Sequence, residues 1–258
     1  MLRSNWERFY VVFMVLLFIT GLSLAMYPYV QGAVVDRRMT LEAEDFLSRF
    51  SGDPEDGELD IIVFPTMPEE TEKREHQNLW DAMTAYNENI YAEGQSGLST
   101  SYAYQVPSFT LTDYGLEDEK FGVIQIPKLD LEMPLFLGAS NQHMADGAAV
   151  LTETSIPIGG RNTNAVIAGH RGYDSASYFR YIPDLAVGDT VIITNLWETL
   201  SYKVVEEKII DPYEVDEILI QSGKDMVTLL TCHPYASGGK QRYVIYCQRT
   251  DNTIVQRK

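Results

Sequence analysis

Hydrophobic residues follow three successive patterns along the chain. Residues 9–26 carry no charge, parts of residues 40–90 have apolar positions at helical spacing, and residues 121–249 break into short apolar runs. Gly, Pro, Asn and Asp separate most of these short runs, as they do between strands. The pattern predicts an N-terminal membrane segment (residues 1–35), a spacer of helices and loops (36–118) and a β-rich domain (119–258).

The N-terminal apolar stretch is long enough to span a membrane. Phe9 to Met26 comprises 18 residues, which make about 27 Å of helix and so approach the hydrocarbon thickness of a bilayer. Arg3 and Arg8 precede it, which favours a cytoplasmic N-terminus, although Arg37 and Arg38 follow it. A cleaved signal peptide is the alternative, but the run is long and no Ala-x-Ala-like site follows. We therefore expect a single-pass membrane protein with the rest of the chain outside the cell.

The spacer combines two amphipathic helices with an acidic run. Thr40 to Phe50 predicts a short helix that Thr40 caps, and residues 69–90 predict a second helix with an apolar stripe (Leu79, Met83, Tyr86, Ile90). Residues 42–75 contain twelve acidic and three basic residues, which is typical of a solvated spacer. Residues 94–112 predict a loop rich in Ser, Gly and Tyr.

The β-rich domain contains nine short strand candidates, and Tyr178 to Leu185 adds one helical turn. Their spacing and punctuation predict a mainly β fold, a small closed or half-closed barrel with short helices. The candidates are 122–127, 133–137, 148–151, 165–168, 190–194, 200–205, 208–210, 227–231 and 242–246.

Composition excludes several classes of function. The net charge of −17 argues against a nucleic-acid partner, because phosphate binding needs a basic patch and none is visible. Two cysteines among 258 residues exclude a fold that disulfides hold together. No metal-ligand spacing appears, so we expect neither a metal nor another cofactor.

One strand–loop–strand unit contains two candidate catalytic residues. Val227 to Thr231 predicts a buried strand that ends at Cys232, and after a loop rich in Pro, Ser and Gly the next strand begins at Arg242. A deprotonated thiol is a nucleophile, and a permanently charged guanidinium can stabilise a developing oxyanion. The pair is therefore suited to acyl transfer.

A histidine completes the set from elsewhere in the sequence. Residues 164–169 form another short apolar strand candidate, and His170 follows it, so His170 can serve as the proton partner of Cys232. His233 is the rival base because it directly follows Cys232. Neighbouring residues of an extended chain point in opposite directions, which favours His170.

These motifs resemble those of sortases. Thr228 to Cys232 followed by Arg242 is similar to the Thr-Leu-x-Thr-Cys and Arg signature of that family, and Ala168 to Gly172 is similar to its His motif. The similarity covers residues 122–249, and the chain most resembles class C, the pilin-polymerising sortases. Similar segments are Ile126–Lys128, Thr154–Gly160, Asn195–Lys203 and Gly223–Asp225, and Ala85–Asn87 resembles the helix before the barrel.

The resemblance implies a membrane-anchored cysteine transpeptidase of the Gram-positive envelope. Such enzymes cleave a Leu-Pro-x-Thr-Gly-like sorting signal after Thr and pass the acyl group to an amine, either a pilin Lys or a cell-wall precursor. It further implies that Cys232, His170 and Arg242 are catalytic, and that Thr231, Ala168 and Gly169 contact the substrate. Cleavage with water as acceptor, or an inactive envelope scaffold, are the alternative functions.

Several features depart from class C, including the two that follow. The Asp-Pro-aromatic triplet of the class C lid is absent between the helix and the barrel, and Val150 stands where that class commonly has a His. Residues 91–118 are left as a lid-like loop, in which Tyr102, Tyr104 and Phe109 are the plausible rings for closure. We expect this loop to leave the site open or loosely covered.

The two cysteines are not expected to form a disulfide. Cys247 lies five residues beyond Arg242, about 16 Å further along the strand. A disulfide needs Cα atoms within about 7 Å. Cys247 is therefore expected to be a thiol without a catalytic role.

Overall fold

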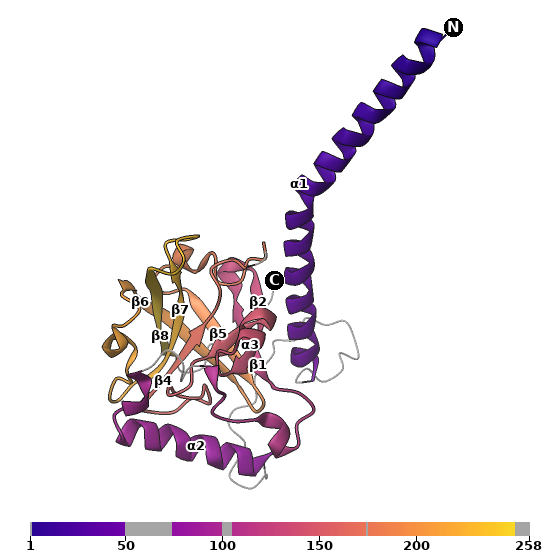
Figure 1. Cartoon of the computed structure of the whole chain (residues 1–258). Coiled ribbons are helices and arrows are strands. Elements are labelled where there is room, and N and C mark those ends of the chain that lie inside the picture. Colours follow the sequence, from indigo (N-terminus) through magenta and orange to yellow (C-terminus); the bar gives the residue numbers. More distant parts are fainter. Residues whose placement is uncertain (1, 50–73, 100–104, 174, 251–258) are drawn as a thin grey trace.

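Eight strands form one closed barrel in a computed structural model that describes residues 2–49, 74–99, 105–173 and 175–250 (Figure 1). Around the barrel the order is β1-β2-β3-β4-β7-β8-β6-β5. This confirms the expected mainly β, closed barrel. The strands are β1 (Lys120–Ile126), β2 (Leu131–Leu137), β3 (Ala148–Val150), β4 (Thr163–Ala168), β5 (Thr190–Asn195), β6 (Thr199–Ile210), β7 (Asp225–His233) and β8 (Gln241–Arg249).

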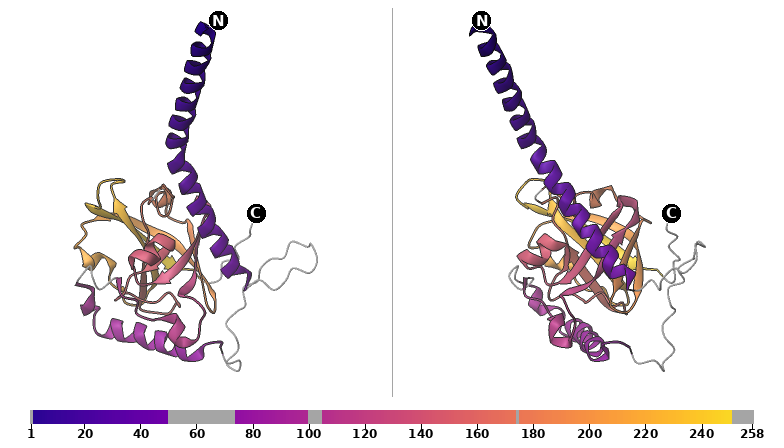
Figure 2. Two further views of the ribbon diagram at one scale, coloured as in Figure 1. Left: turned by 45° about the vertical axis from the view of Figure 1, so that its right-hand side comes forward. Right: turned by 90° about the vertical axis from the view of Figure 1, so that its right-hand side faces the viewer.

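Within the described residues, helices are few and mostly short. They are α1 (Leu2–Ser48), α2 (Gln77–Ala92) and α3 (Asn141–Asp146), with 3₁₀ turns η1 (Ser96–Ser99), η3 (Leu111–Tyr114), η4 (Pro127–Leu129), η5 (Ile182–Asp184) and η6 (Val215–Ile218). The helical turn expected within residues 178–185 corresponds to η5. In Figures 1 and 2, α2 crosses the end of the barrel opposite the β7–β8 loop, and the C-terminal half of α1 runs along the barrel's side.

Alternation along the strands produces two apolar layers. Val227 and Leu229 of β7 belong to the interior cluster of the barrel, whereas Met226 and Leu230 belong to a second cluster on the outer face. Because side chains alternate between the faces of a strand, this parity continues to the strand's end. This parity decides on which face the candidate side chains of β7 and β8, Cys232 and Arg242, lie.

The two strands expected at residues 200–205 and 208–210 are a single strand. β6 continues through Val205 to Ile209, although these residues are exposed, because its backbone pairs with β8 along this stretch. The register shifts between Val204 and Glu206, where β6 has one residue more than β8, as in a β-bulge. The exposed, charged residues after Val204 hid this continuity in the sequence.

The expected separate helix at residues 40–50 is also wrong. α1 runs without interruption from Leu2 to Ser48, and the hydroxyl of Thr40 donates to the carbonyl of Asp36 at 3.1 Å inside it rather than capping a new helix. Pro28 lies within α1, and the helix bends in Figure 1, as proline causes by removing a backbone donor. The helix is long and apolar enough to span a membrane, and its apolar half is exposed.

α2 begins later than predicted. His76 precedes it with a left-handed φ of 52°, and Gln77 is its first residue; residues 69–73 lie outside the described parts of the chain. Its buried face contains Leu79, Met83 and Ile90, which confirms three positions of the predicted stripe. The fourth buried residue is polar, Asn87.

Asn87 fixes α2 to the barrel by two hydrogen bonds. Its side-chain amide donates to the carbonyl of Ile156 at 3.0 Å, and its amide oxygen accepts from the backbone N–H of Ile156 at 2.8 Å. Both groups are buried. Removing such a partner leaves the buried donor and acceptor without compensation.

Asn87→Ala is therefore expected to lower the free energy of unfolding by about 2–4 kcal/mol, since each orphaned group costs roughly 1–3 kcal/mol. The measurement is urea denaturation of the full chain in detergent. Asn89→Ala, on the exposed side of the same helix, is the matched control and should change little. Equal effects of the two substitutions would contradict this account of Asn87.

Candidate active site

The candidate catalytic residues come from three neighbouring strands of the barrel. β4 and β7 are parallel, with Ala168 opposite Leu230, so their C-terminal ends meet at one rim. β8 is antiparallel to β7, and Arg242 lies directly opposite Cys232. His170 follows β4 by two residues. The topology thus brings His170, Cys232 and Arg242 to the same rim.

The three side chains also share one face. Ala168 of β4, Leu230 of β7 and Val244 of β8 contribute to the outer apolar cluster. His170 and Cys232 lie two residues beyond the first two, and Arg242 lies two residues before Val244. A step of two residues keeps the face. The set therefore stands above the outer apolar cluster, with β7 between its two neighbours.

Cys232 and Arg242 are held together by the loop that joins their strands. Gly239 has a φ of 76°, and a Cβ there would lie 3.3 Å from Cys232 Sγ and 3.2 Å from Arg242 Nη1. Arg242 Nη1 donates to the carbonyls of Gly239, at 2.7 Å, and Gln241, at 3.1 Å. These bonds fix the guanidinium on the side of the loop that faces the thiol. The glycine leaves room for both groups.

His170 lies between two tyrosine rings. Tyr173 stacks on the imidazole at 4.6 Å between ring centroids, and Tyr178 meets it edge-on at 5.7 Å. The N–H of Phe179 donates to the carbonyl of His170 at 2.9 Å. Burial lowers the pKa of His170, because desolvation disfavours the imidazolium. The side chain is therefore a neutral imidazole near pH 7.

The segments before Cys232 and His170 are joined by internal bonds. The N–H of Gly169 donates to Leu230 O at 3.1 Å, and the Thr231 hydroxyl donates to Gly169 O at 2.8 Å. A Cβ at Gly169 would lie 2.6 Å from the Phe179 ring. These contacts fix the segment before Cys232 relative to the segment before His170. Ala168 is buried in the outer cluster, and substrate contact by Thr231, Ala168 and Gly169 remains a prediction.

His233 lies on the other side of β7. Its Nδ1 is 2.7 Å from Arg171 Nη1, and its ring is 5.7 Å from that of Tyr243. A guanidinium only donates, so Nδ1 of His233 accepts this hydrogen bond. Arg171 also donates to Cys232 O at 3.3 Å. This environment gives His233 a structural partner and favours His170 as the base.

The ring residues of the lid-like loop are placed only in part. Phe109 packs edge-on against Tyr86 at 5.6 Å and tilted against Tyr114 at 6.2 Å, on the flank of the molecule beside α2. Tyr102 and Tyr104 lie outside the described residues. Cys232 itself is half-buried.

Both cysteines are free, which confirms the prediction that they form no disulfide. Cys247 lies opposite Val227 at the far end of β7 and is fully buried in the barrel interior. Burial raises the pKa of its thiol. Among the residues that the structure describes, no three His, Cys, Asp or Glu side chains are placed to hold a metal ion.

The sequence did not indicate the residues that surround the candidate set. Arg171 belongs to the motif of residues 168–172 and Tyr178 begins the expected helical turn, but no pattern in the sequence indicates that they or Tyr173 contact the candidate set. Gly239 carried a usable signal, because two consecutive glycines often mark left-handed backbone. Its closeness to Cys232 still required the pairing of β7 with β8.

Comparisons with known proteins identify the family of this chain. The Sortase domain family model matches residues 124–250. Sortase D of Bacillus subtilis (strain 168) is 28% identical over 182 residues, which cover 70% of this chain and 86% of that protein. Sortase C from Clostridium perfringens SM101 is 30% identical, with a TM-score of 0.57 over 70% of this chain and 93% of that one. Sortase C1 of GBS pilus island 1 is 27% identical, with a TM-score of 0.63 over 69% and 90%. The chain belongs to the sortase family.

Proposed function

We propose that this protein is a membrane-anchored cysteine transpeptidase that cleaves a Leu-Pro-x-Thr-Gly-like sorting signal after Thr. The acyl group then passes to an amine, a pilin Lys or a cell-wall precursor, in pilus assembly or surface-protein anchoring. The observation that carries the proposal is the convergence of His170, Cys232 and Arg242 on one face at the ends of β4, β7 and β8.

The first half-reaction forms a thioester. The neutral imidazole of His170 accepts the proton of Cys232, and Sγ attacks the carbonyl carbon of the substrate's Thr. The tetrahedral intermediate collapses as the C–N bond to Gly breaks. His170 then donates its proton to the departing amine, which leaves the Thr acyl group on Cys232.

The second half-reaction restores the thiol. The acceptor amine attacks the thioester carbonyl while His170 takes its proton, and the C–S bond breaks as the new amide forms. The proton returns to Cys232 through His170. In both half-reactions Arg242 stabilises the oxyanion, since two of its hydrogen bonds hold its guanidinium beside Sγ.

α1 is the proposed membrane anchor. Its apolar half is exposed along the whole stretch from Phe9 to Met26, as a bilayer-spanning helix requires. Arg3 and Arg8 favour a cytoplasmic N-terminus. The barrel then stands outside the cell, where surface proteins emerge.

Cys232→Ala is expected to abolish cleavage of a sorting-signal peptide. His170→Ala and Arg242→Ala should each lower the rate by about 10²–10⁴-fold, because general acid–base and oxyanion terms are of that size. Mass spectrometry of the products, with and without an added amine, is the measurement. Cys247→Ala removes the other thiol and should retain activity.

The products of that assay separate the three functions. A ligated product in the presence of amine supports the transpeptidase. Free acid alone, with amine present, indicates a hydrolase, and an uncleaved peptide with folded protein indicates an inactive scaffold. Cleavage by the Cys232→Ala protein would refute the assigned nucleophile.

The titration of His170 tests its role as a neutral base. Because its pKa is lowered by burial, imidazolium should form only below the ordinary value of about 6.5, and activity should fall as the pH falls through that midpoint. NMR titration of the His170 Cε1–H measures the midpoint directly. Tyr173→Ala admits water to the ring and should move the midpoint toward 6.5. A wild-type midpoint at or above 6.5 would contradict the assignment.

Access to Cys232 is expected to need no activating event. A thiol reagent should label Cys232 in the resting enzyme at a rate little changed by Tyr102→Ala, Tyr104→Ala or Phe109→Ala. The buried Cys247 should not react, and Cys232→Ala provides the blank. A large acceleration in any of the three ring variants would show that the loop gates the nucleophile.

A further inference from the structure

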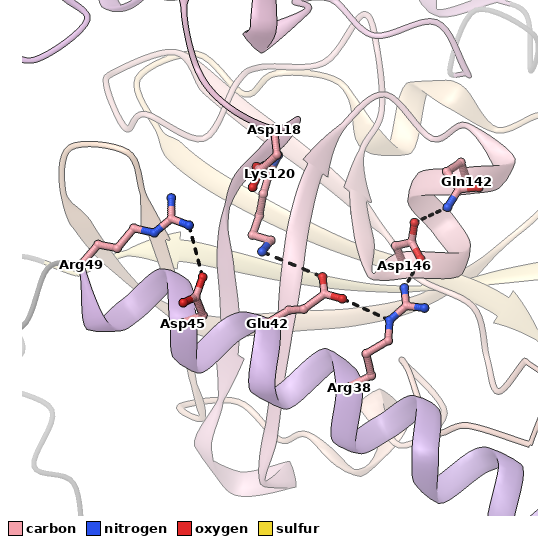
Figure 3. A network of polar contacts seen from close by, with 8 residues as sticks. All are labelled: Arg38, Glu42, Asp45, Arg49, Asp118, Lys120, Gln142 and Asp146. Atoms are coloured by element: carbon pink, nitrogen blue, oxygen red, sulfur yellow. Dashed lines mark hydrogen bonds and ion pairs between the residues drawn. The ribbon is translucent and has the colours of Figure 1, made fainter.

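The C-terminal half of α1 docks on the barrel through a continuous face. Gly32, Met39, Ala43 and Phe46 are buried on it, at helical spacing. Ion pairs flank this face (Figure 3): Arg38 bonds Asp146 and Glu42, and Glu42 lies 3.9 Å from Lys120. The docked half directly follows the exposed apolar half in one helix.

The part of this face nearest the membrane segment touches the loop after His170. A Cβ at Gly32 would lie 2.2 Å from Ser175 O, so the helix backbone packs directly on the loop backbone. One turn later, the two carboxylate oxygens of Asp36 accept from Ser177 N–H at 2.9 Å and from Ser177 Oγ at 3.1 Å. Charge-assisted bonds of this kind are stronger than neutral ones.

The loop held in this way carries the two tyrosine rings that contact His170. Ser177 lies between Tyr173 and Tyr178 in the sequence, and these are the two rings that contact the imidazole. Ala176, which is fully buried, bonds back to Tyr173 O at 2.9 Å. Displacement of Ser175–Ser177 would therefore move both rings.

Tyr178 is tied to α1 from a second side. Its hydroxyl donates to Ala145 O at 2.7 Å, next to Asp146, the partner of Arg38. Burial raises the pKa of Tyr178 to about 12, with smaller contributions from the carboxylates of Asp146 and Asp36 opposed by Arg38. The tyrosine thus stays a neutral donor.

We infer that Asp36 is a positioning residue for the transpeptidation reaction, through which the membrane anchor holds the loop that orients His170. The inference rests on the proposed function. Asp36 touches neither the substrate nor the reacting atoms. It acts through Ser177 on Tyr173 and Tyr178, and so couples docking of α1 to the geometry of the base.

The experiment compares kcat and KM of the full chain in detergent for Asp36→Ala, Asp36→Asn and two controls. Asp36→Ala should lower kcat by about 10- to 100-fold with KM little changed, since small misplacements of a catalytic group have such effects. Asp36→Asn should restore most of kcat, because its amide oxygen accepts from Ser177 N–H and its amide N–H donates to Ser177 Oγ.

The controls separate positioning from docking in general. Asp45→Ala removes an exposed acid of the same helix that pairs with Arg49 at 3.2 Å, and Lys120→Ala breaks a helix–barrel ion pair away from the loop. Both should keep the wild-type kcat. Loss of kcat in Lys120→Ala as large as in Asp36→Ala would overturn the inference, as would equal losses in Asp36→Ala and Asp36→Asn.

The His170 titration supplies a second readout. In Asp36→Ala the NMR midpoint should move toward 6.5 as the rings loosen, and an unchanged midpoint or a wild-type kcat would overturn the inference.

If Asp36→Ala does not fold, Ser177→Ala removes one of the two bonds and should show a smaller effect in the same direction; the absence of any effect there would also overturn the inference. If wild-type and Cys232→Ala proteins are equally inactive, the proposed function fails, and the titration alone decides.

Discussion

The pairing of β7 with both β4 and β8 is the constraint on which the site depends. The parallel register with β4 and the antiparallel register with β8 jointly bring three chain segments to one rim. A slip of one residue in either ladder would turn a functional side chain to the opposite face. Closure of the barrel resists such a slip, since every strand has two partners. The bond from Thr231 to Gly169 extends the β4–β7 register beyond the last paired residue.

Much of this arrangement could be predicted from the sequence. Short apolar runs ending at Cys232 and His170 and beginning at Arg242 placed the three residues at strand ends. Punctuation by Gly, Pro and Asn predicted a barrel. The bounds of individual elements were less predictable. β6 continues through exposed residues because β8 pairs with it. α1 continues past Asp36 because no Gly or Pro occurs between residues 36 and 48 to end the helix.

The surroundings of His170 could not be predicted in the same way. Tyr173 and Tyr178 lie on either side of Ser177 in the sequence, which bonds to α1, and Tyr178 also bonds to α3. The bond between Asp36 and Ser177 joins residues 141 positions apart. Such contacts form only where separate elements pack together. No local pattern of residues predicts how those elements are placed relative to one another. The same holds for Arg171, which lies in the loop after β4 and contacts Cys232 and His233 at the end of β7.

The close approach of Gly32 to Ser175 also sets the distance between the apolar stretch of α1 and the loop after His170. Six residues of helix separate Met26, the end of the apolar stretch, from Gly32, or about 9 Å along the axis. With the anchor in a bilayer, as proposed, the loop beside His170 stands just above the lipid headgroups, whose layer is roughly 5–7 Å deep. The proposed substrate would then have to bind close to the membrane surface. An extended peptide rises about 3.3 Å per residue, so only a few residues of a bound substrate would span the distance from the headgroups to the candidate site.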